Sequence, residues 1–393
     1  MPFDFDELID RRDTDSLKYD FAVRRNKPAD ILPLWVADMD FKAPPAVIEA
    51  LTARAQHGIF GYTDGRDAYY SAVQNWFFNR FQWETRTEWI IKTPGVVFAI
   101  SAAVRAFTER GDAVLIQPPV YYPFTETIEA NARRLVKNEL IYEDGRYSID
   151  FEDFERKITE NQVKLFILCS PHNPVGRVWT REELTQLGEI CLAHNVLVIS
   201  DEIHADFTYP GHPHTVFADL DARFAANSIT CTAPSKTFNL ASLQISNIFI
   251  PDRELRRRFK QELTRAGYSQ PNVMGLEACR AAYEHGGPWL DELRTYLLQN
   301  LLFAREYIAR SMPGVRLVEP EGTYLIWLDF RPLGLSGKTL DDLVVYKAGL
   351  WLDAGEMFGD GGEGFQRINI ACPRATLEEA LKRLARALEE RTR

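Results

Sequence analysis

The sequence is poor in positive charge. Its 393 residues include 46 lysines and arginines against 56 aspartates and glutamates, which gives a formal net charge of -10 at pH 7. Nucleic acids and anionic membrane surfaces bind proteins through a basic face that releases counterions or meets lipid headgroups. The charge balance therefore predicts neither kind of partner and favours a small-molecule ligand.

Cysteine is also scarce, and no two cysteines form a C-x-x-C pair. The five cysteines are scattered, which argues against a disulfide framework or a structural zinc site and favours reduced thiols. No run approaches the roughly 20 apolar residues of a membrane span. The start, MPFDFDELIDRRDTDS, is acidic and polar where a signal peptide would be basic and then apolar. These absences predict a cytoplasmic protein with no membrane partner.

The chain does contain an alternation of strand-like and helix-like segments. Near-continuous apolar runs lie at residues 113–119, 163–170, 196–200, 228–233 and 246–250, and they alternate with amphipathic stretches such as 97–107 and 181–195. Apolar strands joined by crossover helices form a mostly parallel sheet that is covered on both faces. We therefore expect an α/β core, in a chain long enough for two or three packed units.

The pattern changes after Pro271. Residues 273–312 have a helical pattern that is interrupted near Gly286, Gly287 and Pro288, which predicts two helices. The strand candidates GVRLV, GTYLIWLDF and FQRINIA follow, and an amphipathic segment at 375–393 closes the chain. This order predicts a smaller α+β domain after about residue 289.

Three short segments carry a polar residue directly after a buried strand. They are SPHNPVGRVW, ISDEIHADF and TAPSKTFNLASLQ, and their polar residues are Asn173, Asp201 and Lys236. Taken singly, the lysine fits a solvated loop, the Asp-Glu pair a helix cap and Asn-Pro a turn. Their positions, however, leave room for one βα unit between neighbours. We expect them to meet at the carboxyl edge of the sheet, where ligands bind in open α/β folds.

With these segments in this order, the chain resembles the fold-type I enzymes that depend on pyridoxal 5'-phosphate (PLP), the aspartate aminotransferase superfamily of class I/II aminotransferases. The resemblance extends over essentially the whole chain. The segments WVADMDF, GYTDG, SPHNPVGRVW, SDEIH, APSKTFN and RINIACPR are similar to the cystathionine β-lyase or C-S lyase branch of the MalY/PatB type. The family implies a large domain with a mostly parallel seven-stranded sheet at 46–288 and a smaller α+β domain at 289–393. It also implies an N-terminal arm at 1–45 that contributes to the small domain.

The resemblance implies a role for each polar residue at the sheet edge. Lys236 would hold PLP as a Schiff base and, once displaced by substrate, remove the proton from Cα. Asp201 would pair with the pyridine nitrogen and keep it protonated, because an adjacent anion favours the cation. Asn173 would hydrogen-bond the phenolic oxygen. Tyr121 would stack on the pyridine ring, with Tyr122 as the competing choice.

The cofactor phosphate needs backbone N–H groups, and a loop that enters a helix at KTPGVVFAIS can supply them. By the family pattern, Ser235 and Tyr62 would add hydroxyl groups, and Tyr62 would come from the second subunit of a homodimer with shared active sites. Gln244 is a departure, because it stands where aspartate aminotransferases have an arginine that binds the phosphate. The residues expected at the helix start are Gly95, Val96 and Val97.

The amino-acid substrate also needs a partner for its carboxylate. Arg374 matches the family's carboxylate-binding arginine, since a planar guanidinium suits that group; the alternative is a surface arginine before the last helix. Trp35 and Tyr62 are expected on the substrate side. His204 would lie near the cofactor edge or pack behind it.

Two further features receive no chemical role. His212 and His214 lie in a polar loop with no carboxylate or cysteine at ligand spacing, so no metal is expected. The glycine-rich segment 358–365 lacks the strand-loop-helix frame of a dinucleotide site, and we interpret it as a loop bordering the active site.

Removal of the Cα proton can lead to two outcomes, and the fold supports both. The amino group can be transferred, or a β-thiolate can be expelled and pyruvate and ammonia released. The branch resemblance favours β-elimination from a sulfur amino acid such as cystathionine, cysteine or cystine, with Tyr121 or Lys236 protonating the sulfur. The alternative is a PLP-dependent aminotransferase. Some members of this branch also bind a transcription activator, a further role that a surface patch would carry.

Overall fold

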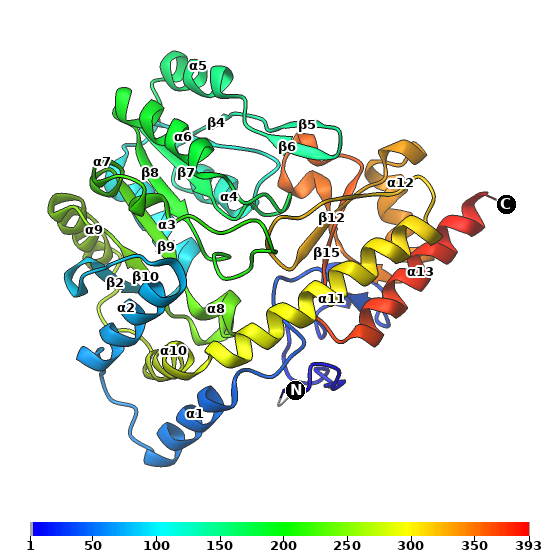
Figure 1. Ribbon diagram of the computed structural model, residues 1–393, viewed down its shortest axis with the longest axis horizontal. Coiled ribbons are helices and arrows are strands. Elements are labelled where there is room, and N and C mark those ends of the chain that lie inside the picture. The colour runs from blue at the N-terminus through cyan, green and yellow to red at the C-terminus, as the bar shows by residue number, and fades with distance from the viewer. Residues whose placement is uncertain (1–2, 393) are drawn as a thin grey trace.

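A seven-stranded sheet forms the centre of the protein, in a computed structural model that describes residues 3–392 (Figure 1). The strand order is β2-β10-β9-β8-β7-β3-β4, and β10 alone runs antiparallel to its neighbours. This is the mostly parallel sheet that the sequence predicts. Its strands are β2 (Ile90–Thr93), β3 (Ala113–Ile116), β4 (Arg134–Lys137), β7 (Leu165–Cys169), β8 (Leu197–Asp201), β9 (Ser228–Thr232) and β10 (Ser246–Phe249).

Both faces of this sheet are buried, which explains the continuous apolar runs. In β7, Ile167 packs with α3 (Val96–Phe107) on one face, whereas Phe166 and Leu168 pack with α6 (Arg181–Ala193) on the other. Because side chains alternate along a strand, Asp201 at the end of β8 points to the same face as Ile199, the face that α3 covers. The start of α3 and the carboxylate of Asp201 are thereby brought together.

The interrupted helical region forms two helices, as predicted: α10 (Val273–His285) and the 25-residue α11 (Gly287–Ser311). Pro288 lies in the first turn of α11, where its missing N–H is tolerated. A Cβ on Gly286 would lie 2.5 Å from both the Ala282 carbonyl oxygen and the Phe238 ring, so no side chain fits at the junction. Figure 1 shows α11 running from beneath the large sheet to α13 (Arg374–Thr392).

A second, antiparallel sheet lies in the C-terminal part, with strand order β11-β12-β15-β14. The N-terminal segment joins this part, because β1 (Leu32–Pro33) pairs in parallel with β13 (Leu350–Trp351), and Trp35 stacks on Trp351 at 4.3 Å between ring centroids. The exact division at residues 45 and 289 stays a prediction. The four strands are β11 (Arg316–Val318), β12 (Leu325–Asp329), β14 (Asp353–Ala354) and β15 (Phe365–Asn369).

The remaining elements surround these two sheets. Measured over residues 3–392, no helix combines the length and the apolar character that crossing a bilayer requires. The other elements are α1 (Pro45–His57), α2 (Asp67–Phe81), α4 (Pro123–Ala130), α5 (Phe151–Asn161), α7 (Ala222–Ala226), α8 (Pro234–Thr237), α9 (Arg253–Arg265), α12 (Gly337–Asp342), β5 (Ile141–Glu143) and β6 (Arg146–Ser148).

A buried ion pair fastens the two sheets to each other. Arg177, in the loop after β7, donates from Nε to the Glu321 carboxylate at 2.8 Å, and Glu321 lies in the turn between β11 and β12. The same carboxylate oxygen accepts from the backbone N–H of Val178 at 2.9 Å, and the Glu321 N–H donates to the Gly176 carbonyl at 2.8 Å. The carboxyl end of β7 is therefore held against the smaller sheet.

We expect Glu321→Ala to lower the free energy of unfolding by about 2–3 kcal/mol, because it removes one partner of a buried, charge-assisted pair while Glu183 continues to neutralise Arg177. The matched control is Glu319→Ala, two residues earlier, whose partner Arg305 is exposed; it should cost at most about 1 kcal/mol. Urea unfolding of both variants measures the two free energies. Equal losses of stability would contradict the role of the buried Arg177–Glu321 pair.

Candidate functional site

A cavity of about 440 Å³ lies at the carboxyl edge of the large sheet. It is lined by loop residues after β3, β7 and β8, by the start of α3 and by α8. Nine of the predicted site residues meet there, together with Gln244. They are Gly95, Val96, Val97, Tyr121, Asn173, Asp201, His204, Ser235 and Lys236.

Lys236 and Asp201 are the two ionisable groups of opposite charge in this cavity wall. Burial lowers the pKa of the Lys236 amine to about 8, against the opposing effect of Asp38 and Asp201. Burial raises the pKa of the Asp201 carboxyl to about 7, against the opposing effects of the Ile203 N–H and of Lys236. An amine with its pKa near neutrality can exchange a proton readily, and the Lys236 Nζ donates to the Ala37 carbonyl oxygen at 2.7 Å.

The start of α3 faces the open part of the cavity. Gly95 is the residue that caps this helix, and a Cβ built on it would meet no atom of residues 3–392 within 4 Å. The first backbone N–H groups of a helix point outward along its axis and attract anions. An anionic group can therefore approach the backbone at Gly95 and Val96 without a steric barrier.

A residue outside the predicted set contacts Asn173, which lines the cavity. Arg367, the central residue of β15, donates from one terminal nitrogen to Asn173 Oδ1 at 2.8 Å, and from the other to the Trp35 carbonyl at 3.0 Å and to Asp353. Its Nε is buried and has no hydrogen-bond partner within residues 3–392. Strand alternation in FQRINIA could have identified Arg367, because Ile368 and Ile370 pack into the core and leave Arg367 on the opposite face.

Arg374 does not lie at the cavity. It is the first residue of α13, and its Nε donates to the Asn300 side chain at 2.8 Å while its guanidinium covers the Phe303 ring. Both partners belong to α11, against which α13 packs. The expectation that Arg374 faces the ligand is corrected by this packing, which turns the side chain toward the helix pair.

Two other predicted residues also lie outside the cavity wall. The Tyr62 side chain is 97% exposed, in the loop before α2. Trp35 is buried against Trp351 and contributes its backbone carbonyl, rather than its ring, to the site through Arg367. Of the two competing tyrosines, Tyr121 lines the cavity, whereas the Tyr122 ring contacts the Phe358 ring edge-on at 6.1 Å.

His204 lines the cavity with its Nδ1 buried and unpartnered in the described chain. Burial, with the cations Lys236 and Arg367, lowers its pKa well below the ordinary value, so the ring is neutral.

The two loop features that received no chemical role lie outside the cavity wall. Of the two loop histidines, His214 Nε2 pairs with the buried Glu202 carboxylate at 2.8 Å. In the glycine-rich segment, Phe358 lies beneath the Arg367 guanidinium, 4.9 Å from it.

Comparison with known proteins agrees with this geometry. The sequence model of the family described as aminotransferase class I and II matches residues 29–384 of this chain. The chain belongs to this family. Within it, the chain is 49% identical to cystathionine beta-lyase PatB of Bacillus subtilis (strain 168), over 98% of this chain and 99% of the relative.

Solved structures of similar proteins superpose closely on this fold. Cystalysin from Treponema denticola, which contains PLP, aligns with a TM-score of 0.96 and 40% identity over 99% of this chain and 100% of its own. The PLP-bound C-S lyase of Staphylococcus hominis aligns with a TM-score of 0.92 and 33% identity over 98% of both chains. Compared by sequence, an aspartate aminotransferase from Pyrococcus horikoshii is more distant than PatB, at 25% identity over 93% of both chains.

The residues of this family member fit the PLP of those relatives. The cavity contains an amine for an aldehyde at Lys236 and a carboxylate for a ring nitrogen at Asp201, and it has open space for an anion at Gly95. The buried, unpartnered nitrogens of His204 and Arg367, in the described part of the chain, leave hydrogen-bonding capacity for a ligand. These features agree in size and polarity with a planar, phosphorylated pyridine.

We compare Asp201→Asn with wild type, both free of cofactor, by the free energy of unfolding. The variant should gain stability relative to wild type as the pH rises from 5 to 8. The folded-state pKa of Asp201 is raised to about 7, so between about pH 4 and 7 the carboxyl ionises in the unfolded chain only, and rising pH favours unfolding. Wild type should lose at most about 1.4 kcal/mol per pH unit relative to the variant in this window. Urea unfolding at pH 5, 6, 7 and 8 measures this slope, and a difference that does not vary with pH would contradict it.

Proposed function

We propose that this protein is a PLP-dependent carbon-sulfur β-lyase of the cystathionine β-lyase or cysteine desulfhydrase type. It releases a thiol, pyruvate and ammonia from a sulfur amino acid. The observation that carries the proposal is the convergence of Lys236, Asp201 and Asn173 on one cavity, in a chain whose relatives at 49% and 40% identity are named for C-S cleavage or contain PLP.

Lys236 is the covalent holder of the cofactor and the base of the reaction. Bound PLP supplies an electron-withdrawing ring that takes up the electron pair of the substrate Cα–H bond. The Lys236 amine, with a pKa near 8, is neutral in part at physiological pH, so it can accept the proton released at Cα. The Ala37 carbonyl, 2.7 Å away, orients this amine when it is free.

Asp201 holds the ring nitrogen in its protonated form. Its carboxylate lies in a buried position, where an anion gains most from a cationic partner. Asn173 would donate to the phenolic oxygen of bound PLP through its amide nitrogen, because its Oδ1 already accepts from Arg367. Tyr121, which lines the cavity, would hold the ring from one face, and either Tyr121 or Lys236 would protonate the departing sulfur.

The phosphate binds at the start of α3. The backbone N–H groups of Gly95, Val96 and Val97 and the hydroxyl of Ser235 surround this position at the cavity wall. Gln244 lines the same cavity as a neutral amide, so the helix N-terminus supplies most of the positive potential.

Arg367 binds the α-carboxylate of the substrate. Its Nε remains unpartnered among the described residues, and its neighbour Asn173 lines the cavity. A guanidinium binds a carboxylate through two parallel hydrogen bonds, which fixes the amino acid in one orientation. This assignment moves the predicted role from Arg374 to Arg367 within the same segment, RINIACPR.

The working enzyme is a cytoplasmic homodimer. Tyr62 is almost fully exposed in a single chain, and Phe60, Ile59 and Val97 nearby are exposed apolar side chains. A second subunit would cover these side chains and contribute its tyrosine to the phosphate of the neighbouring site. The substrate partner is a small amino acid, and neither nucleic acid nor membrane is involved.

Purified protein with PLP is expected to form pyruvate from cystathionine, and Lys236→Ala should lower the rate by about a thousandfold or more because it removes both the covalent link and the base. Lys260→Ala, at an exposed position on α9, is the control and should act as wild type. A substrate panel scored for pyruvate, free thiol and amino transfer to 2-oxo acids measures the reaction. Rapid amino transfer without pyruvate from any thioether would make the protein an aminotransferase instead.

Substituting each of the two arginines of RINIACPR in turn should show different effects on kcat/KM. We expect Arg367→Gln to lower kcat/KM by about 100-fold or more, because one charge-assisted carboxylate contact is lost. Arg374→Gln should change kcat/KM by less than about threefold, since its guanidinium faces α11. Steady-state kinetics on cystathionine measures both, with circular dichroism to establish folding, and the opposite ranking would restore the role to Arg374.

A further inference from the structure

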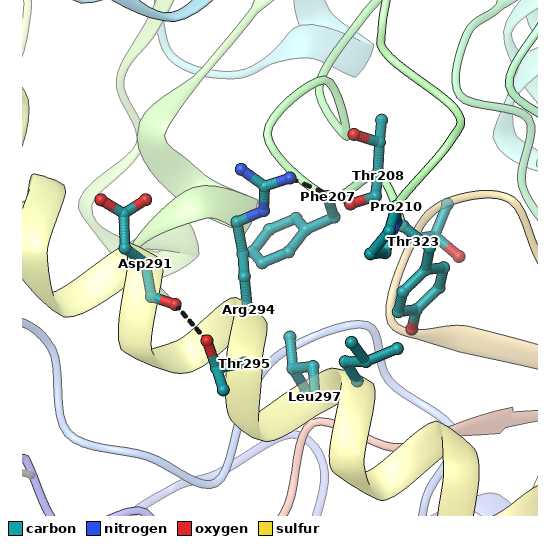
Figure 2. A pocket seen from close by; sticks show the side chains of 10 residues that line it. Phe207, Thr208, Pro210, Asp291, Arg294, Thr295, Leu297 and Thr323 are labelled. Atoms are coloured by element: carbon teal, nitrogen blue, oxygen red, sulfur yellow. Dashed lines mark hydrogen bonds between the residues drawn. The ribbon is translucent and has the colours of Figure 1, made fainter.

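A second cavity, of about 220 Å³, lies between α11 and the loop that follows Phe207 (Figure 2). Its wall comes from three parts of the chain: residues 207–210, residues 291–298 of α11, and Thr323 before β12. None of these residues lines the cavity at Lys236. The two cavities are therefore separate sites, and nothing in the proposed lyase chemistry uses the second one.

Arg294 provides the charge of this second cavity. Figure 2 shows its side chain rising from α11 beside Phe207, and one terminal nitrogen donates to the Thr208 carbonyl at 3.0 Å. Over residues 3–392, no carboxylate oxygen lies within 4.0 Å of this guanidinium. The one carboxylate in the cavity wall, Asp291, is paired with Arg80 at 2.6 Å. Arg294 is thus the charged side chain of this wall that has no ion pair within 4.0 Å among residues 3–392, while the buried Asp206 carboxylate acts on it from a longer distance.

The rest of the wall is apolar, with hydroxyl groups at intervals. Leu297, Leu298 and Pro210 form the apolar part next to the Phe207 ring, and the Tyr209 hydroxyl is buried with no partner in the described chain. The cavity volume of about 220 Å³ admits a small organic acid. A guanidinium beside an apolar wall matches an anionic head joined to a short hydrocarbon tail.

We propose that this cavity binds a small monocarboxylate with a short apolar tail. Arg294 pairs with the carboxylate, and the tail lies against Leu297, Leu298 and Pro210. A carboxylate suits the site better than a cationic ligand, because the Arg294 guanidinium is positively charged and can form two parallel hydrogen bonds to it.

Titration of hexanoate into the PLP-loaded enzyme by isothermal calorimetry tests the site. Arg294→Gln should weaken binding by about tenfold or more, because it removes a charge-assisted contact. Leu298→Trp should also weaken it, by filling the cavity. Arg310→Gln, at an exposed position near the end of the same helix, is the matched control and should bind hexanoate as wild type does. Hexylamine, with the same tail and opposite charge, should not bind.

Lyase activity and melting temperature of each variant establish that it is folded. Wild-type hexanoate affinity in Arg294→Gln would overturn the proposal, as would equal binding of hexylamine. So would purely competitive inhibition against cystathionine with an inhibition constant that Arg294→Gln leaves unchanged, since hexanoate would then occupy the substrate carboxylate site. This last outcome would leave the proposed lyase function intact, so that the two proposals fail separately.

Discussion

A guanidinium buried between the two sheets, that of Arg367, needs acceptors from several parts of the chain. Burying a cation is costly unless it is paired and hydrogen-bonded. Asp353 supplies the opposite charge, Asn173 an amide oxygen and Trp35 a backbone carbonyl. These partners come from β14, from the loop after β7 and from the N-terminal segment. Satisfying one charge therefore brings together the smaller sheet, the large sheet and the N-terminal arm at one side of the cavity.

The N-terminal arm is fixed by a second buried charge network. Lys18, nearly inaccessible to solvent, donates to Asp40 at 2.8 Å, and Arg11 pairs with both Asp38 and Asp40 at 2.7 Å. This network fixes the irregular backbone segment that contains Ala37. The Ala37 carbonyl accepts hydrogen bonds from the Lys236 amine and, at 3.0 Å, from the Tyr324 hydroxyl. The position of the reactive amine thus depends on residues some 200 positions earlier in the chain.

Burial does the remaining chemical work at the site. It draws the pKa values of Lys236 and Asp201 toward each other, to about 8 and about 7, so both groups can exchange protons near neutrality. The same burial keeps His204 neutral. The carboxyl ends of the parallel strands face this cavity. Lys236, Asp201 and His204 are therefore enclosed by the protein and still line a space that a ligand can enter.

The sequence by itself determined the large sheet and predicted three residues that the fold brings to one cavity. Strands β7, β8 and β9 are buried runs whose carboxyl ends lie at one edge of the sheet, and Asn173, Asp201 and Lys236 lie at or shortly after these ends. Only the tertiary structure showed that Arg374 packs on α11 and that Tyr121, rather than Tyr122, lines the cavity. The packing of α13 on α11 determines where the Arg374 side chain lies, and the course of the loop after β3 determines which tyrosine faces the cavity. Such contacts between distant segments leave no periodic signal in the chain.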